Sequence, residues 1–258
     1  EQEGVYTKQR KIVTTHAYDV MAVAVGDFNN DGFLDLASAG GASEGLSLIA
    51  WYNNTDGKGT FGEQNIIKNE GAALPNSIAV GDFNNDGFLD ITATCQDTTI
   101  RWFENTDGKG TFAEKFVATR FEMATAVVVG DFDDDGNVDL VAASWSNGIA
   151  WYPNDGKGTF DTEIIITIAA PYAWSLAVGD FDHNGLLDVA CAFKGLPLNK
   201  PLNGTIAWYN NTGGKTANWT QIDVTTSLAG AWGVATGDFN NDGFLDLASA
   251  SQGHRIAN

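Results

Sequence analysis

Apolar residues along the chain fall into short, nearly continuous runs that are separated by turns rich in glycine, asparagine and aspartate. No stretch shows the 3.6-residue spacing of an amphipathic helix, whereas short apolar runs bounded by turns are typical of strands covered on both faces. Val, Ile, Thr, Phe and Trp are abundant, and 30 glycines stand against 5 prolines. The pattern therefore predicts many short β-strands joined by tight turns.

These runs recur around one ten-residue segment. GDFNNDGFLD begins at Gly26 and returns unchanged at Gly81 and Gly237, and variants begin at Gly130 and Gly179. An apolar run precedes and another follows each copy, and in the first four repeats a strand–turn–strand element such as IAWYNNTDGKGTF comes next. Four strands in each repeat of about 50 residues predict an all-β protein, a five-bladed β-propeller of four-stranded antiparallel blades.

The two ends of the chain complement each other. Residues 4–6 align with residues 59–61, which begin the last strand of a repeat, and residues 255–258 stop where a third strand should begin. We expect a single domain over residues 1–258, closed by pairing the N-terminal strand with the C-terminal blade, which would remove exposed sheet edges. The repeats lie near residues 26–36, 81–91, 130–140, 179–189 and 237–247.

The charge narrows the range of partners. A formal net charge of −19 argues against nucleic acid, which requires a basic surface, and against an anionic membrane surface. No apolar run is long enough to insert into a membrane. The two cysteines, Cys95 and Cys191, lie in strand-like runs of separate repeats, so we expect buried thiols.

Each repeated segment places oxygen-bearing side chains at positions 1, 3, 5 and 9 of a loop, with glycine at position 6. Alternate spacing directs these side chains to one side, the glycine permits a sharp turn, and the carbonyl of position 7 can complete the shell. Hard oxygen ligands in this number suit Ca²⁺. The expected ligands, for up to five ions, are Asp27, Asn29, Asp31, Phe33, Asp35; Asp82, Asn84, Asp86, Phe88, Asp90; Asp131, Asp133, Asp135, Asn137, Asp139; Asp180, Asp182, Asn184, Leu186, Asp188; and Asp238, Asn240, Asp242, Phe244, Asp246.

The alternative is a set of turns with solvated aspartates. Sixteen of the 33 acidic residues occupy these ligand positions, so each loop would crowd three or four carboxylates together without a cation. Such crowding costs several kcal/mol through repulsion and raised pKa values, which favours a metal. The fourth loop, with Asn184 at position 5, is the weakest of the set.

The loops resemble the calcium loop D-x-[DN]-x-[DN]-G-x-x-D of FG-GAP (or VCBS) repeat proteins, and all five repeats match it. Relatives in this family include the integrin α-subunit propeller and an integrin-like fungal lectin. The resemblance implies blades with calcium loops on one face of a propeller and the remaining loops on the other.

The loops expected on that other face differ most among the repeats, and variable loops on a regular scaffold are where specificity is expected. Tryptophan offers a flat apolar surface for a sugar ring, with amides and imidazole as hydrogen-bonding neighbours. For the two tryptophans that stand six residues before a loop aspartate, plugging a central channel is the alternative. The candidate ligand-binding residues are Trp145, Trp174, Trp232, Gln96, Asn147, Gln252 and His254.

Three functions remain open from the sequence. A calcium-binding, lectin-like or adhesive module that binds a glycan is favoured, followed by an integrin-type propeller that binds a cell-surface or extracellular protein. A polysaccharide lyase or hydrolase is third. Such an enzyme would need two carboxylates that converge at a defined separation. Open calcium loops fill at extracellular concentrations, so we expect a secreted or cell-surface location. The sequence leaves open whether the chain is one module of a larger protein. The carboxylates considered for catalysis are Asp19, Glu70, Asp97 and Glu122.

Overall fold

The computed structural model describes residues 13–14, 17–41, 47–69, 74–170, 172–194, 203–213 and 218–251. In these residues the regular structure consists of β-strands alone, and no helix that could cross a bilayer occurs among them. The strands form antiparallel sheets that follow one another along the chain. The predicted all-β class is therefore confirmed.

Each sheet runs in chain order from an inner to an outer strand, four of the sheets have four strands, and the described part of the fifth has two. The strands are β1 (Tyr18–Gly26), β2 (Asp35–Gly41), β3 (Ser47–Asn54) and β4 (Phe61–Lys68); β5 (Pro75–Gly81), β6 (Asp90–Cys95), β7 (Ile100–Asn105) and β8 (Phe112–Ala118); β9 (Ala124–Gly130), β10 (Asp139–Ser144), β11 (Gly148–Tyr152) and β12 (Ile164–Thr167); β13 (Ala173–Gly179), β14 (Asp188–Phe193), β15 (Asn203–Asn211) and β16 (Trp219–Ala229); and β17 (Ala231–Gly237) and β18 (Asp246–Ser251).

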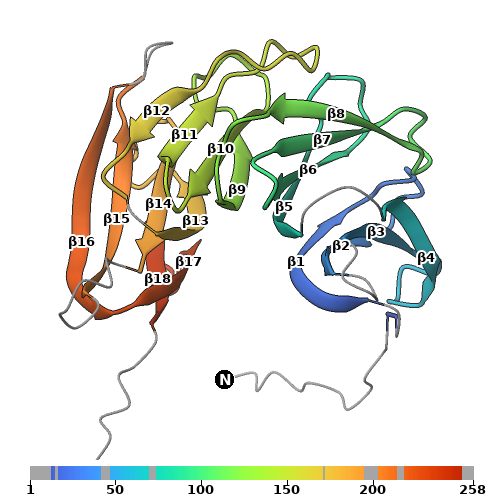
Figure 1. Ribbon diagram of the computed structural model, residues 1–258, viewed down its shortest axis with the longest axis horizontal. Helices are drawn as coiled ribbons and strands as arrows, with labels where there is room; N and C mark the ends of the chain where they lie inside the picture. Colours follow the sequence, from blue (N-terminus) through green and yellow to red (C-terminus); the bar gives the residue numbers. More distant parts are fainter. Residues whose placement is uncertain are drawn as a thin grey trace, which may run out of the picture.

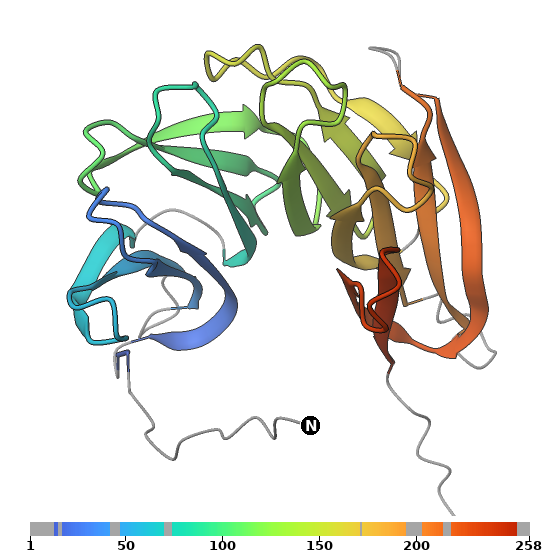
Figure 2. The same cartoon turned by 180° about the vertical axis from the view of Figure 1, so that it is seen from behind.

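The sheets stand side by side in an arc (Figure 1), with their inner strands towards the centre and their outer strands on the rim, as Figure 2 shows from behind. The inner strands β1, β5, β9, β13 and β17 each contact the next one along the arc. The first and fifth sheets lie at the two ends. This is the blade arrangement of a propeller. The predicted closure involves residues 1–12 and 252–258, which lie outside the described residues, so it stays a prediction.

The middle strands are buried because a neighbouring sheet covers each face. Every residue of β6, β10 and β14 is buried, so these strands lack the alternation of buried and exposed positions that a half-exposed strand shows. Trp102 and Trp151 fill the space between sheets, and Phe83 packs edge-on against Trp102 at 6.1 Å between ring centroids. Cys95 and Cys191 are buried free thiols, as expected.

The same junction joins each sheet to the next. An aliphatic side chain at position 8 of one loop lies over the glycine that precedes the previous loop, where a β-carbon would come within 2.4 to 3.0 Å of it. These pairs are Leu89 and Gly26, Val138 and Gly81, Leu187 and Gly130, and Leu245 and Gly179. In three junctions an asparagine Nδ2 also donates to a phenylalanine carbonyl of the previous sheet: Asn105 to Phe28 (2.8 Å), Asn154 to Phe83 (2.7 Å) and Asn211 to Phe132 (2.6 Å).

Candidate functional site

Each predicted calcium loop connects an inner strand to the next strand of its sheet, and its first aspartate organises the turn. Asp27 accepts hydrogen bonds from the backbone N–H groups of Asp31 (3.1 Å) and Gly32 (2.8 Å), and the same two bonds occur in the other four loops. The position 6 glycines have positive φ. Position 4 is also left-handed in every loop and holds Asn, Asp or His, which tolerate this conformation: Asn30, Asn85, Asp134, His183 and Asn241.

The aspartate at position 9 begins the next strand and is held from two sides. In the third loop, Asp139 accepts hydrogen bonds from the N–H of Phe132 (3.2 Å) and of Asn154 (2.7 Å) and from Nε1 of Trp151 (3.0 Å). Its side chain is buried, with 1% of the residue exposed. The carboxylate thus ties its own loop to the following strands, β10 and β11, before any ion is considered.

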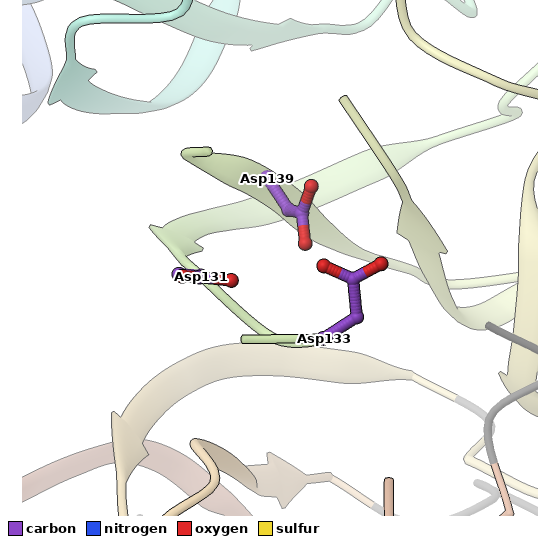
Figure 3. A group of neighbouring side chains, drawn as sticks. All are labelled: Asp131, Asp133 and Asp139. Atoms are coloured by element: carbon purple, nitrogen blue, oxygen red, sulfur yellow. The ribbon is translucent and has the colours of Figure 1, made fainter. Parts of the chain in front are cut away.

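Carboxylates converge most clearly in the third and fourth loops. Oxygen atoms of Asp131, Asp133 and Asp139 lie within 4.8 Å of one another, and Figure 3 shows the three side chains facing a common space. The fourth loop brings Asp180, Asp182 and Asp188 together in the same way. An all-oxygen set at this spacing has the chemistry that Ca²⁺ requires, so the residues present fit the ion.

The protonation behaviour of the position 9 aspartates agrees with this fit. Burial, together with the nearby carboxylate of Asp86, raises the pKa of Asp90 to about 7. Burial and Asp133 raise the pKa of Asp139 to about 7, and burial with Asp182 and Asp180 raises the pKa of Asp188 to about 6. Burial therefore disfavours the charged form of these carboxylates, which a bound cation would stabilise.

The first, second and fifth loops carry asparagine at position 3. In the second loop, Nδ2 of Asn84 donates to Asp86 (2.9 Å) and to Glu104 (3.1 Å), so its amide is oriented by two carboxylates.

In the fourth loop, Asn210 donates to Asp182 (2.6 Å), and Asn184 donates to the carbonyl of Asn211 (3.0 Å). Glu104 and Asn210 were missed from the sequence, although both directly precede the asparagine that ends a third strand.

The candidate ligand residues lie at the other end of the inner strands. The rings of Trp145 and Trp174 are 5.5 Å apart, those of Trp174 and Trp232 are 4.7 Å apart, and Nζ of Lys194 lies 4.2 Å from the Trp232 ring centroid. Gln96 lies at the same end of the inner strands, where its side chain donates a hydrogen bond to the side chain of Asn76 (3.2 Å).

The remaining candidates are placed differently. Asn147 is in the same turn as Trp145, where its Oδ1 accepts a hydrogen bond from Ser146 (2.8 Å). Gln252 and His254 lie outside the described residues, as does Glu70. Asp97 is held by Arg101 and Thr99, so its carboxylate is committed to an ion pair.

The chain matches a known protein family along most of its length. The model of a family described as FG-GAP-like repeat matches residues 38–93, 90–142, 131–191 and 199–249. The chain belongs to this family. No curated protein sequence matches this FG-GAP-like chain.

Solved structures share the fold of this FG-GAP-like protein. One is an Agrocybe aegerita lectin that specifically recognises non-reducing terminal N-acetylglucosamine, with a TM-score of 0.54, 18% identity, and coverage of 78% of this chain and 51% of that one. Another is BBS1N in complex with ARL6DN, soaked with lead, with a TM-score of 0.53, 14% identity, and coverage of 90% and 62%. The FG-GAP-like chain thus spans between half and two thirds of each of these chains, and the likeness establishes the fold.

Proposed function

We propose that this FG-GAP-like protein is a calcium-binding recognition module that acts outside the cell and binds carbohydrate. The observation that carries the proposal is the convergence of carboxylates around a buried aspartate in the repeated loops, above all Asp131 and Asp133 around Asp139. Side chains at positions 1, 3 and 9, with the amide or carboxylate at position 5, would hold each ion. The calcium supplies positive charge that neutralises these carboxylates.

Holding an ion in a loop would stabilise the blade. In the third loop the ion would join the segment after β9 to Asp139, which is already bonded to Asn154, the second residue after β11. Binding free energy of this kind adds to folding free energy because the unfolded chain has no preformed site. Such loops fill at millimolar calcium, which supports an extracellular location.

Carbohydrate is favoured over a protein partner by the size of the recess at the tryptophan end. The hollows there measure about 280 and 340 Å³, the scale of a small-molecule site. The lectin of similar fold binds a sugar, which supports the same class of ligand here. A glycan array probed with the calcium-loaded protein, and again with EGTA, tests the proposal. Binding to no glycan, combined with capture of a specific extracellular protein, would replace it with the protein-binding alternative.

The ligand role of the third loop gives a specific expectation. Replacing Asp133→Ala removes the position 3 donor, so calorimetric titration should show one fewer calcium ion per chain, or one site weakened at least about tenfold. Asp134→Asn is the matched control, because it removes the same charge from the same loop at position 4, where three other loops already have asparagine. Equal calcium stoichiometry in both variants would contradict the assignment.

We also propose that the propeller closes, with the N-terminal strand completing the fifth sheet. The two ends of the arc carry complementary halves of the repeated junction. Leu34, which corresponds to Leu89, is 64% exposed, and the nearest atoms to a β-carbon on Gly237 belong to Phe239 of its own loop. Closure would place Leu34 over Gly237 and cover Phe239, which is 60% exposed although its equivalents Phe28 and Phe83 are buried.

Paired cysteines test the closure. Leu34→Cys with Gly237→Cys should form an intrachain disulfide under mild oxidation, because a disulfide needs Cα atoms within roughly 7 Å. Leu245→Cys with Gly179→Cys, at a junction present in the structure, is the positive control. Mass spectrometry of the monomer gives the answer: crosslinking of the control pair but not of the test pair would mean that the ends do not meet.

A further inference from the structure

Every inner strand carries a β-bulge at the same place. In all five, the register with the second strand skips the residue that stands six positions before the first loop aspartate. A bulge leaves its extra residue unpaired and redirects the side chain, and bulges are frequent next to functional sites. The skipped residues are Met21, Asn76, Thr125, Trp174 and Trp232.

All five bulged residues line one hollow of about 280 Å³ among the inner strands. The repeats are identical at positions 1, 6 and 9 of the calcium loops, yet at the bulge they hold one methionine, one asparagine, one threonine and two tryptophans. Metal binding and packing therefore keep the repeats uniform, whereas the hollow has a different side chain from each sheet. A recess built from five different side chains has the asymmetry that ligand recognition requires.

A second hollow of about 340 Å³ adjoins the first. It shares Met21, Asn76, Thr125 and Trp174 with the first hollow, and it adds Gln96, Met123 and Trp145. Trp174 lines both hollows, while Trp145 lines only the second and Trp232 only the first. Trp174 therefore faces both recesses, and its ring contacts Trp145 of the second and Trp232 of the first.

The turns beside Trp174 are held by backbone hydrogen bonds and contain strained residues. Trp145 N donates to the carbonyl of Met123 (3.2 Å), Tyr172 N to that of Trp145 (3.3 Å), and Lys194 N to that of Tyr172 (3.2 Å). Met123 and Tyr172 have φ values of 52° and 59°, which bulky residues rarely adopt. Strain of this kind persists only where the surroundings impose it and is concentrated at ligand sites, and a rigid site loses less entropy on binding.

The chemistry of the two hollows selects an uncharged ligand with alternating apolar and polar surfaces. Three indoles and the thioether side chains of Met21 and Met123 offer apolar contact, and amides of Asn76 and Gln96 with the hydroxyl of Thr125 offer hydrogen bonds. Among the described residues, neither hollow is lined by a carboxylate, an ammonium or a guanidinium group. A pyranose ring has this combination, with C–H groups on its faces and hydroxyls on its edge.

We propose that the two hollows form one binding site for a neutral oligosaccharide, with two consecutive pyranose units on either side of Trp174. The proposal rests on the carbohydrate-binding function proposed above. It adds where the ligand binds, that two sugar units are bound, and that the ligand is uncharged. Trp174 contacts both units, Trp145 contacts the unit in the second hollow, and Trp232 contacts the unit in the first.

The test uses the calcium-loaded full chain and follows tryptophan fluorescence and titration calorimetry. The probes are cellobiose, maltose, lactose and N,N′-diacetylchitobiose, each compared with its monosaccharides. The preferred disaccharide should bind at least about tenfold more tightly than its monomers, since a second unit adds a second set of contacts. Trp174→Ala should weaken it by at least about tenfold, as expected for a central aromatic anchor. Trp145→Ala should reduce its affinity to that of a monosaccharide.

Two further variants keep these outcomes interpretable. Trp174→Phe retains an aromatic face and should retain most of the affinity, and Ile165→Ala, on the outer strand β12 and 47% exposed, should leave it unchanged. Disaccharide binding that survives Trp174→Ala in a variant with normal thermal stability would overturn the location while leaving the carbohydrate function intact. Failure of every probe and of the glycan array would overturn both.

Discussion

Removing calcium should lower the midpoint of thermal unfolding by roughly 5–10 °C for each ion lost. An ion present at about 100 times its Kd contributes about 2.7 kcal/mol, and in a chain of this size each kcal/mol shifts the midpoint by about 2–4 °C. The effect is large because the position 9 aspartates Asp35, Asp90, Asp139 and Asp188 are buried among other carboxylates, which repel one another once the ion is gone. Differential scanning calorimetry in calcium and in EGTA measures the shift.

Three controls separate calcium binding from other effects of the chelator. EGTA already saturated with calcium should leave the midpoint where it was, and magnesium should restore little stability, because it demands a stricter octahedral shell. Asp133→Ala should show a smaller loss than the natural sequence by the contribution of one ion. Superimposable melting curves in calcium and in EGTA would remove any structural role for the metal.

The arrangement of the blades could be predicted from the sequence because each repeat encodes its own local structure. The glycine at position 6, the oxygen-bearing side chains at positions 1, 3, 5 and 9 and the paired apolar runs are all local signals, and the structure has loops and strands where they predict them. Clustering of Asp131 with Asp133 is also local, since the two residues are separated by one position. Asp139 joins them because it begins the strand that pairs with β9.

The ligand face could be predicted only in part, because it depends on register and on contacts between sheets. Trp174 and Trp232 were left between binding a ligand and plugging a channel, since a sequence does not show which residue of an apolar run is skipped by a bulge. Trp145 belongs to the third repeat and Trp174 to the fourth. The contact between their rings therefore could not be predicted from the pattern within one repeat. The bond from Asn105 to Phe28, 77 positions apart, was missed for the same reason.

The calcium-free protein should become less stable as the pH rises from 5 to 8. Burial raises the pKa of Asp90 and Asp139 to about 7 and that of Asp188 to about 6, whereas the pKa of an aspartate in the unfolded chain is near 3.8. Between pH 4 and 7 the folded chain therefore holds more protons than the unfolded chain, and stability falls as those protons are lost. With three such groups, the midpoint should drop on the order of 10 °C over this range.

Calcium should remove most of this dependence. Because an ion binds only the deprotonated loop, the calcium-loaded protein and the unfolded chain hold almost the same number of protons on these aspartates above pH 5, so the stability of the loaded protein should stay nearly constant from pH 5 to pH 8. The difference in midpoint between loaded and calcium-free protein is therefore smallest near pH 5 and grows towards pH 8. Melting curves at matched ionic strength, with calcium removed on a chelating resin instead of by EGTA, measure both series. Parallel pH profiles in the two series would mean that protons and calcium do not compete for the same carboxylates.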